Sequence, residues 1–599
     1  MESSGKLSYT FRKYPLLRWI LSFLIIAAVI FAIIFYNVKS KPVPVIDSIN
    51  PPVGSPGDVV VLKGSNFGEV RDMNYVEIAG SKLTNSAYIS WTDEEIKIVL
   101  PANVQDGLVY VGTKDRKSEP VLFANEVDIP VPVPAIKQVT RPIITSLSSN
   151  KIRIGEVLTI EGDNFGDSKN QSKVYFSADY GEKQTRSSNY LNNMISCNEN
   201  DFDYVSWTNN EIKVHVPDGA VTGHIIVDTG KEHSEGAKIT IDKSAGDKTY
   251  KNKKIYLLQY SADIADVVSS STDTTITLRC PVPETTVYQP NVQINEVTPQ
   301  PILLNYQKDL IHQITKVKDS KEKIVFNQSF VLPVYEVNTN VNPDKIGLYK
   351  DTEKNLLTNT VRADDLVPSN AEEVKKLLPE IIGRQKNPYR QAKLIYDYMI
   401  DNYEILSNPR SADSNPLDLI NDKRGDAYDF AVIFTALLRA CDIPSVTNAG
   451  VLVGGDLTTQ SHWWSEFYID RVGWIPVDVA LGAGMEYNRW NDRNQDEQLL
   501  KDIKIVGSED MSEKELLEKQ TEELKKRQKQ EDRQYYFGNM DSHHIVFSRG
   551  WNKLKPFSAD NKIVQKPRSF ALQSIWEEAS ANVDKYSSYW SVPVVKGIY

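Results

Sequence analysis

Strand-like runs rich in apolar residues occur in two separate stretches of the first 250 residues, and polar and apolar residues alternate at 95–98 in the first and at 211–214 in the second. The first stretch runs through 59–62 into a Gly-Ser-Asn-Phe-Gly turn at 64–68, and the second runs through 157–160 into Gly-Asp-Asn-Phe-Gly at 162–166. A Trp-Thr pair follows each turn, at 91–92 and again at 207–208. The two stretches are therefore an internal repeat, and alternation broken by turns predicts a small β-sandwich in each copy.

These repeats place two domains, at 43–125 and 141–242, with a proline-rich segment between them at 126–140. Because proline restricts the backbone, we expect that linker to be stiff and extended. The second copy carries an additional polar loop between Gly166 and Trp207, and Cys197 lies in it.

The longest apolar run lies close to the N-terminus. From Trp19 to Tyr36 only Ser22 is polar, and about 18 helical residues nearly span a hydrocarbon core of roughly 30 Å. A cleaved signal peptide is the alternative, but the run is long for one and no small-residue cleavage site follows it. We therefore predict a transmembrane signal anchor at 19–38.

Basic residues flank this segment unequally. Four precede it and two follow it closely: Lys6, Arg12, Lys13 and Arg18, against Lys39 and Lys41. The positive-inside rule then predicts that residues 1–18 are cytoplasmic and that the rest lies outside the cytoplasm. The expected location is the cell membrane, with a single pass and an extracytoplasmic bulk.

The remaining pattern predicts a further β-rich domain at 250–343, followed by a mixed helical and strand pattern at 370–485. A charged helix is expected at 505–534, where Ser512 and Glu515 have the spacing of a capping box. We expect residues 535–599 to pack back on the mixed domain. Within them, His543 and His544 are adjacent on an expected strand, where neighbouring side chains face opposite sides, so joint metal ligation is not expected.

Composition changes this picture only a little. A chain of 599 residues is too long for one core, and its 41% hydrophobic content is ordinary for globular domains. The net charge of −10 leaves no basic surface for nucleic acid. The three cysteines have no zinc-binding or disulfide-rich spacing, so free buried thiols are expected, although pairing of two of them is left open.

Three blocks in the mixed domain carry candidate chemistry. They are 424–431, which opens an apolar helix, then 461–468 and 473–478, which read as strands. Together they resemble the transglutaminase-like superfamily, whose pattern is Gly-x-Cys-x-Asp-Phe-Ala, then His-x-Trp-x-Glu, then Gly-Trp-x-Pro-x-Asp. The two N-terminal repeats are similar to immunoglobulin-like IPT/TIG domains.

The resemblance implies a papain-like α+β fold and assigns roles by position. His462 stands where the family has its general base, and Asp478 stands where it has the orienting aspartate. The nucleophilic cysteine, however, is replaced by Ala427. A thiol at a helix N-terminus has a lowered pKa and attacks as thiolate, whereas a methyl group can do neither. Cys441 lies about 21 Å further along the same helix, at 1.5 Å per residue, and cannot substitute.

The residues around this position could still form a binding cleft. The candidate cleft residues are Asp426, Tyr428, Trp463, Trp464 and Trp474. Asp426 and Tyr428 flank the nucleophile position but point about 100° away from it on a helix, which argues against either as nucleophile. A metal site made of Asp426, His462 and Asp478 has no motif to support it, so no metal and no cofactor is predicted.

The whole chain is thus expected to be multidomain: a transmembrane helix, two immunoglobulin-like sandwiches, another β domain and a transglutaminase-like domain without its nucleophile. This favours a membrane-anchored recognition or scaffolding protein for a peptide, a protein or a cell-envelope polymer. The alternative is a hydrolase or transferase that uses His462 and Asp478 with a nucleophile other than cysteine. With either function, the two sandwich repeats would serve as a rigid stalk or as ligand-binding modules.

Overall fold

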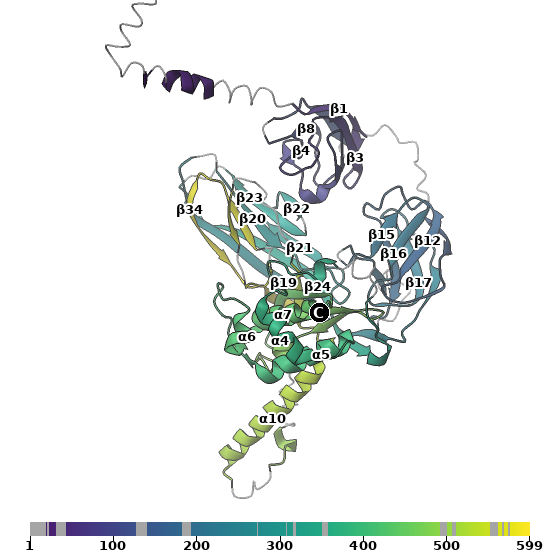
Figure 1. The fold of residues 1–599 in the computed structure, drawn as a ribbon, viewed down its shortest axis with the longest axis vertical. Helices are drawn as coiled ribbons and strands as arrows, with labels where there is room; N and C mark the ends of the chain where they lie inside the picture. Colours follow the sequence, from purple (N-terminus) through teal and green to yellow (C-terminus); the bar gives the residue numbers. More distant parts are fainter. Residues whose placement is uncertain are drawn as a thin grey trace, which may run out of the picture. The chain divides into compact units, whose positions relative to one another are not determined.

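The computed structural model divides the chain into two compact units, Met1–Pro132 and Val133–Tyr599 (Figure 1). It describes residues 19–20, 23–30, 43–114, 116–126, 141–181, 193–199, 201–271, 274–306, 308–315, 319–349, 358–490, 500–505, 511–551, 561–565, 568–572 and 575–599. The predicted cytoplasmic segment 1–18 and the linker from 127 to 140 lie outside the described residues.

The predicted anchor at 19–38 is described only at 19–20 and 23–30, and these residues are helical. In the part of the chain that the structure describes, no helix combines the length and apolar character needed to cross a membrane.

The first unit contains one β-sandwich. One sheet has the strand order β1-β3-β7-β6 and the other β2-β9-β8-β4-β5. The bounds are β1 Val45–Asn50, β2 Val53–Gly54, β3 Val59–Ser65, β4 Tyr75–Ile78, β5 Ser81–Lys82, β6 Tyr88–Trp91, β7 Glu95–Val99, β8 Gly107–Gly112 and β9 Val121–Asn125, with a 3-10 turn at Asn85–Ala87. Alternate residues such as Val60, Leu62 and Ile96 are buried, as a strand period of two requires.

The second unit begins with a sandwich of matching topology. Its sheets have the orders β10-β12-β16-β15 and β11-β18-β17-β13-β14. The bounds are β10 Ile143–Leu147, β11 Lys151–Ile152, β12 Val157–Asp163, β13 Lys173–Ala178, β14 Met194–Ser196, β15 Tyr204–Trp207, β16 Glu211–His215, β17 Ala220–Asp228 and β18 Ala237–Ile241. The internal repeat is therefore a structural repeat, down to one register shift that recurs in the β1/β3 and β10/β12 pairs.

Within each sandwich, the glycine-containing turn and the tryptophan that follows it in sequence contact each other. This contact explains why the two features recur together. In the first sandwich the Trp91 indole N–H donates to the Gly68 carbonyl oxygen at 3.0 Å, and in the second the Trp207 indole N–H donates to the Phe165 carbonyl oxygen at 3.1 Å. A Cβ on Gly64 would lie only 1.9 Å from the Val45 carbonyl oxygen, so only glycine fits. The shared geometry of turn and tryptophan is thus a hydrogen-bonded corner of each sandwich.

A third β domain follows, built on two long strands, β19 Gly246–Ser269 and β24 Ile324–Val341. Its sheets have the orders β21-β24-β19-β34 and β22-β23-β20-β33-β32, with β35 also paired to β19 and β30 to β24. The other bounds are β20 Thr275–Pro281, β21 Gln293–Thr298, β22 Leu303–Tyr306, β23 Asp309–Thr315, β30 Asn539–Met540, β32 Lys562–Gln565, β33 Trp576–Ala579, β34 Val583–Trp590 and β35 Val594–Ile598.

This pairing corrects the expectation that all of 535–599 packs on the mixed domain. Strands β32 to β35 complete the third β domain instead, more than 300 residues after its first strand. Strand β31, His544–Arg549, joins the sheet of the mixed domain, and Phe537 forms an isolated bridge to Val477 of β29. The third domain is therefore made from two distant segments of the chain.

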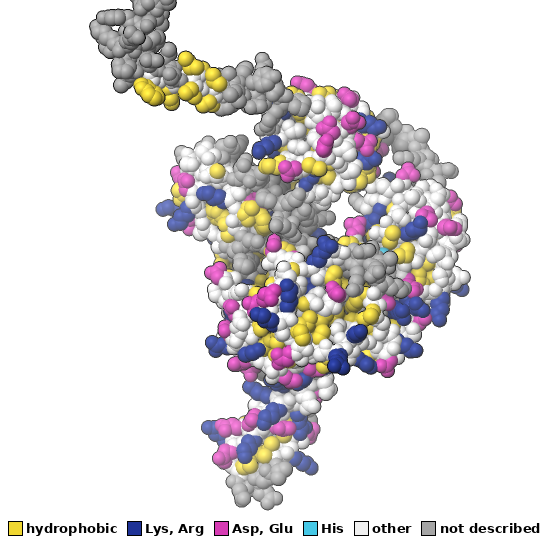
Figure 2. Space-filling view, in the orientation of Figure 1, with side chains coloured by type: hydrophobic (Ala, Val, Ile, Leu, Met, Phe, Trp, Pro, Cys, Tyr) yellow, Lys and Arg dark blue, Asp and Glu magenta, His cyan; other side chains and the backbone are white. Residues whose placement is uncertain are grey.

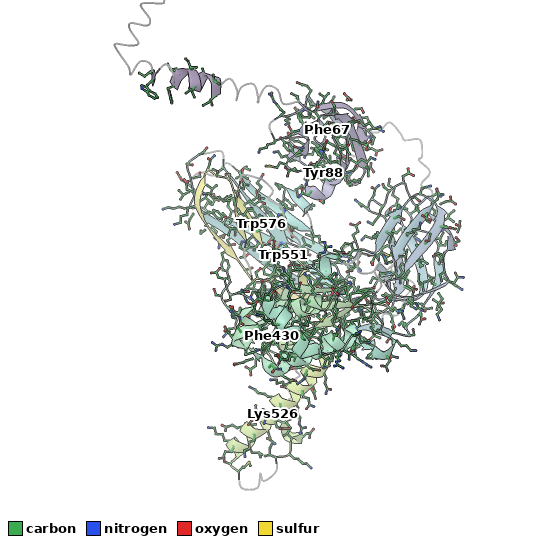
Figure 3. All side chains as sticks on the ribbon, viewed as in Figure 1. Phe67, Tyr88, Phe430, Lys526, Trp551 and Trp576 are labelled. Atoms are coloured by element: carbon green, nitrogen blue, oxygen red, sulfur yellow. The ribbon has the colours of Figure 1, made fainter. Side chains whose placement is uncertain are left out.

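The mixed domain packs helices against an antiparallel sheet with the order β29-β28-β27-β31. Its elements are α4 Glu372–Ile382, α5 Pro388–Asn402, α6 Asp418–Asp422, α7 Ala427–Ala440, α8 Val479–Gly482, β25 Glu404–Ile405, β26 Arg424–Gly425, β27 Ser445–Val453, β28 Thr459–Ile469 and β29 Gly473–Val477, preceded by 3-10 turns at Pro343–Lys345 and Thr358–Thr360. Helix α7 lies against β27 and β28, and Phe430 on it is fully buried (Figure 3).

The charged helix is α10, Glu513–Tyr535, and it begins at the capping box of Ser512 and Glu515. Of its residues only Asp532 is buried, and Lys526 lies on its exposed surface (Figure 3). Acidic and basic side chains are interspersed on the face drawn in Figure 2. A solvated helix tethered at its C-terminal end fits this composition.

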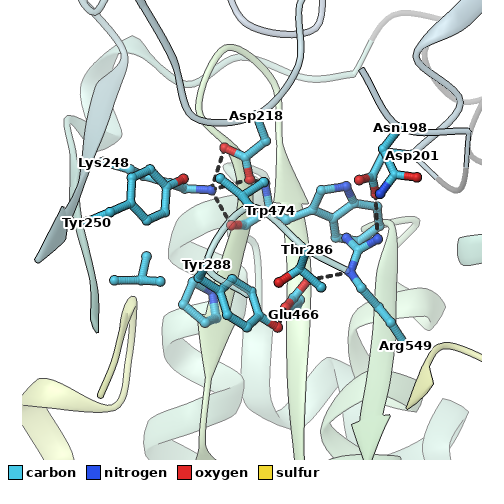
Figure 4. A pocket seen from close by; sticks show the side chains of 13 residues that line it. Asn198, Asp201, Asp218, Lys248, Tyr250, Thr286, Tyr288, Glu466, Trp474 and Arg549 are labelled. Atoms are coloured by element: carbon cyan, nitrogen blue, oxygen red, sulfur yellow. Dashed lines mark hydrogen bonds and ion pairs between the residues drawn. The ribbon is translucent and has the colours of Figure 1, made fainter. Parts of the chain in front are cut away.

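Two buried ion-pair groups join the second sandwich to the mixed domain (Figure 4). Lys248 Nζ contacts Asp218 at 2.6 Å and the Trp474 carbonyl oxygen, while the Trp474 N–H donates to Asp218 at 3.0 Å. Arg549 donates to Glu466 at 2.7 Å and pairs with Asp201. Each group crosses from one domain to another, so the domains of this unit are fixed by buried charges.

We expect Arg549→Gln to lower the free energy of unfolding by about 3–5 kcal/mol, because it leaves two carboxylates without their buried partner. The matched control is Arg533→Gln. Arg533 also pairs with two carboxylates, Asp397 and Asp401, but is half-exposed, so its loss should cost about 0–1 kcal/mol. Urea denaturation followed by tryptophan fluorescence measures both, and equal losses would contradict the prediction.

Glu466 should make the same junction sensitive to acid. Burial opposes its ionisation, but the Arg549 guanidinium and the Tyr288 hydroxyl outweigh burial and hold the pKa of this carboxyl below its usual value. Its contribution to stability is therefore complete above the ordinary glutamate pKa of about 4.3 and is lost as the pH falls through the lower folded pKa. The stability difference between the native chain and Glu466→Gln should be largest at pH 7 and shrink below about pH 4.

Candidate functional site

The predicted His462 and Asp478 lie together in the interior of the mixed domain. His462 is on β28, and its Nε2 is 2.5 Å from Oδ2 of Asp478, the residue that precedes α8. The other carboxylate oxygen of Asp478 accepts the backbone N–H of Leu481 at 2.9 Å, which caps that short helix. Both side chains are fully buried. The aspartate is thus held by the fold and in turn orients the histidine.

Position 427 lies at the first turn of α7, on the side of the helix that faces β28. The Tyr428 ring lies 5.6 Å from the Trp463 ring, and one turn later Ser465 Oγ donates to the Ala431 carbonyl oxygen at 3.0 Å. These contacts align the start of α7 with the His462 end of β28. Residue 427 therefore begins the helix that packs against the strand of His462, and alanine supplies only a methyl group there.

His462 also keeps the arrangement of a general base. Its Nε2 is committed to Asp478, while its buried Nδ1 has no hydrogen-bond partner among the described residues. One nitrogen is held and the other is free, as in a nucleophile–histidine–carboxylate triad. The histidine–carboxylate part of such an arrangement is present, and residue 427 is alanine.

A second histidine, not predicted at this place from the sequence, contacts the same carboxylate. His544 Nε2 is 3.1 Å from Asp478 Oδ2, and its Nδ1 is 2.8 Å from Asp541. Burial lowers the pKa of His544, but Asp541 and Asp478 outweigh it and raise that pKa to about 9. Burial likewise opposes ionisation of Asp478, yet the two imidazoles hold its pKa well below the usual value.

Strand alternation separates His543 from His544, as the sequence predicts. His543 stacks on Trp490 with ring centroids 4.7 Å apart, away from Asp478. What the sequence could not reveal is that β31 pairs with β27, whose other neighbour β28 carries His462. The pairing of β31 with β27, and not the adjacency of His543 and His544 in the sequence, brings His544 close to His462.

An arginine from the C-terminal region covers the start of α7. Arg568 Nη1 donates to both oxygens of Asp426 at 2.9 and 3.0 Å, and its Nη2 donates to Asp429 at 2.7 Å. Its guanidinium carbon lies 4.2 Å above the Tyr428 ring. Since Arg568 is nearly fully buried, this side chain occupies space beside the nucleophile position. The sequence did not predict that Arg568 contacts the start of α7, because it is a single arginine in a polar segment with no recognisable motif.

Asp426 is consequently structural. It caps α7 by accepting the Asp429 N–H at 3.0 Å, while Asp429 accepts the Asp426 N–H at 3.1 Å. Arg410 reinforces the pair, with its backbone N–H on Asp426 and its guanidinium on Asp429. Asp426 does not group with His462 and Asp478 as a possible set of metal ligands. Within the described residues the grouped donors are instead His462, Asp478 and His544, within 4.8 Å of one another.

The candidate cleft residues lie in packed interior instead of along an open groove. Ala427 is 5% exposed, and Trp463 and Trp464 are 2% and 1% exposed. Trp464 stacks on His462, whereas Trp474 lies apart, under Arg549 at 4.4 Å. Trp474 lines a small cavity of about 20 Å³ at the junction with the second sandwich (Figure 4), which is enough for a water molecule and not for a substrate.

Comparisons with known proteins agree with this architecture. Residues 375–479 match the transglutaminase-like superfamily core, and residues 44–123 and 142–242 each match the IPT/TIG domain. The chain thus carries two IPT/TIG domains followed by a transglutaminase-like core, with Ala427 where the family pattern has cysteine.

Similar individual proteins cover only parts of it. A stretch of 136 residues is 26% identical to an uncharacterised protein of Haemophilus influenzae, covering 19% of this chain and 37% of that protein. A stretch of 62 residues is 36% identical to a cyclomaltodextrin glucanotransferase of Bacillus licheniformis, covering 10% of this chain and 8% of that enzyme. The chain therefore spans well under half the length of either relative.

Two solved structures resemble larger parts. A protein of Cytophaga hutchinsonii, provisionally described as a cysteine protease, superposes with a TM-score of 0.32 and 14% identity over 59% of this chain and 91% of its own. The periplasmic domain of TgpA from Pseudomonas aeruginosa superposes with a TM-score of 0.22 and 11% identity over 38% of this chain and 86% of its own. Matches with TM-scores this low do not support assigning the activity of either protein to this chain.

The occlusion of position 427 predicts slow chemistry at a thiol placed there. In Ala427→Cys, iodoacetamide should react slowly in the folded chain, and adding Arg568→Ala should accelerate the reaction about tenfold or more, because one charged hydrogen bond contributes about 1.5 kcal/mol to keeping the site closed. Mass spectrometry of the labelled peptide measures the rate. Burial raises the pKa of Cys441 to about 12, so this native thiol is the internal unreactive reference.

Arg568→Lys separates occlusion from charge in that experiment. It keeps the positive charge beside the new thiol but loses the forked contacts to Asp426 and Asp429. Acceleration in both Arg568 variants would report opening of the site. Fast labelling of the introduced thiol with Arg568 intact would show that this arginine does not occlude it.

Proposed function

We propose that this chain is a membrane-anchored extracytoplasmic protein whose transglutaminase-like domain performs no catalysis and serves as a scaffolding or recognition unit. Its partner is a peptide, a protein or a cell-envelope polymer. The observation that carries the proposal is the alanine at 427, whose neighbours Asp426 and Tyr428 both contact Arg568, together with the His462–Asp478 hydrogen bond.

Loss of the nucleophile removes the step on which the other two groups depend. The imidazole of His462 can accept a proton only from a group that attacks, and the described residues around its Nδ1 offer none within hydrogen-bond reach. In hydrolases of this type, removing the nucleophile costs on the order of 10⁶ in kcat. The buried state of the site adds a second obstacle, because a polymer chain has no open groove there to enter.

The apolar run at 19–38 and the basic residues before it support an anchor with the N-terminus in the cytoplasm. The two IPT/TIG domains then lie between the membrane and the C-terminal domains in chain order. Buried ion pairs fix the second of them to the transglutaminase-like core. We therefore expect the second IPT/TIG domain and the core to move together. Rigid connection is useful for presenting a surface and unnecessary for hydrolysis.

The alternative function is a hydrolase or transferase that uses His462 and Asp478 with a nucleophile other than cysteine. The free Nδ1 of His462 is the observation that keeps this alternative testable. Tyr428 is adjacent, but burial raises the pKa of its hydroxyl to about 12, which disfavours the phenolate.

The deciding experiment assays amide hydrolysis and transamidation on a casein substrate. The full chain in detergent, His462→Gln, Ala427→Cys and Ala427→Cys with Arg568→Ala are compared under the same conditions. We expect the native chain to be no faster than His462→Gln, because without a nucleophile the histidine has no proton to accept. Activity should arise, if anywhere, in the double variant, where the thiol is both present and uncovered.

The matched control for the histidine is His312→Gln, a buried histidine of the third β domain that contacts Gln328. Activity in the native chain that disappears in His462→Gln and persists in His312→Gln would overturn the proposal and support the alternative. Activity that is gained only in the variants carrying Ala427→Cys would show that the catalytic pair is intact and that alanine alone silences it.

A further inference from the structure

We propose that His462, Asp478 and His544 form a buried binding site for a zinc ion. Two imidazole Nε2 atoms lie 2.5 and 3.1 Å from the same carboxylate oxygen, Oδ2 of Asp478, and all three side chains are fully buried. Two histidines and one carboxylate are a ligand set that zinc takes in proteins, with tetrahedral geometry.

The spacing of the donor atoms is close to what zinc requires. Bonds of about 2.0–2.1 Å at tetrahedral angles separate neighbouring donors by about 3.3 Å. Here His544 Nε2 and Asp478 Oδ2 are 3.1 Å apart, and the three donors lie within 4.8 Å of one another. His462 Nε2 is 2.5 Å from Asp478 Oδ2, so this pair must separate by about 0.8 Å to reach the tetrahedral spacing. Within the 4.8 Å limit, the two imidazole donors must approach each other by at most about 1.5 Å.

The surroundings of His544 match those of a zinc ligand, whereas Nδ1 of His462 has no hydrogen-bond partner among the described residues. Metal-bound histidines commonly donate their second ring nitrogen to a carboxylate, which fixes the ring orientation. His544 does so, with its Nδ1 2.8 Å from Asp541. Asp541 is itself held by the Tyr536 hydroxyl at 2.8 Å and by the His543 N–H at 2.9 Å. The ligand Asp478 is tied to the start of α8 by its other oxygen.

Charge also favours a dication at this place. Two carboxylates contact His544, the fully buried Asp478 and the partly buried Asp541, and an uncompensated charge in an interior is costly. One divalent cation between neutral imidazoles balances both of them. A cation on Nε2 of His462 would also leave the ring proton on Nδ1, and the lone pair that a general base needs would be gone. The same residues would then hold a metal instead of moving a proton.

The test measures zinc uptake by the full chain, purified in detergent without a histidine tag and stripped with a chelator. After equilibrium dialysis against micromolar zinc, we expect one equivalent per chain by inductively coupled plasma mass spectrometry. His544→Gln should lose this uptake. His312→Gln, which removes a buried histidine outside the cluster, should retain it.

Asp541→Asn provides a second variant that keeps all three ligands. It should weaken zinc binding about 10–100-fold in competition with a chromophoric chelator, as expected for the loss of a carboxylate that orients a ligand. Cobalt(II) gives an independent signature, because a tetrahedral site produces intense visible absorption bands that should be absent in His544→Gln.

The proposal is overturned if the stripped native chain takes up no stoichiometric zinc, or if His544→Gln retains the full equivalent. Circular dichroism establishes whether each variant is folded. Should His544→Gln fail to fold, the decision passes to Asp541→Asn and the cobalt spectrum of the native chain. Unchanged affinity in Asp541→Asn together with a non-tetrahedral spectrum would place the metal elsewhere.

Discussion

The carboxylate of Asp478 is the point at which the elements of the transglutaminase-like core meet. One of its oxygens accepts from His462 on β28 and from His544 on β31, and the other caps α8. A fully buried carboxylate is costly unless each lone pair is used. The strand order β29-β28-β27-β31 and the start of α8 are therefore coupled to a single ionised group. That coupling accounts for the position of His462 independently of the function of the protein.

The same principle operates on a larger scale between domains. Asp218, Asp201 and Glu466 are placed against Lys248 and Arg549, so that each of these three carboxylates at the junction contacts an opposite charge. Such pairs add little net stability, but they forbid alternative packings, because a displaced domain would leave charges buried and unpaired. The junction is thus better suited to fixing an orientation than to opening around a ligand.

The sequence predicted the features that depend on local residues. Gly64, Asn66 and Trp91 define one corner of a sandwich, and their recurrence was enough to predict the repeat before its hydrogen bonds were known. The start of α7 at Asp426 and the helix after Ser512 follow from capping residues within four positions. Period-two alternation likewise predicted a third β domain.

Long-range relations could not be predicted in this way. Strand β34 pairs with β19 across more than 300 residues, and the alternation within each strand does not name its partner. Arg568 reaches Asp426 by a contact that no periodicity encodes. The predicted tryptophan cleft was inferred from residues adjacent in sequence, but β-strand alternation and strand order send Trp463, Trp464 and Trp474 to three different surroundings.

A histidine and an aspartate in catalytic positions would ordinarily suggest catalysis, but their burial here supplies another reason for both to be present. Replacing His462 alone would leave Asp478 with one fewer donor in a fully buried site, and replacing Asp478 would leave the imidazolium of His544 with a single carboxylate. Breaking one member of a buried charged group costs about 3–5 kcal/mol, a large part of the stability of a domain. The family's nucleophilic cysteine, by contrast, can be replaced by alanine at little structural cost, because a small side chain at the first turn of a helix has no partner to abandon. Folding energetics therefore gives His462 and Asp478 a structural reason to be present together that is independent of any catalytic role.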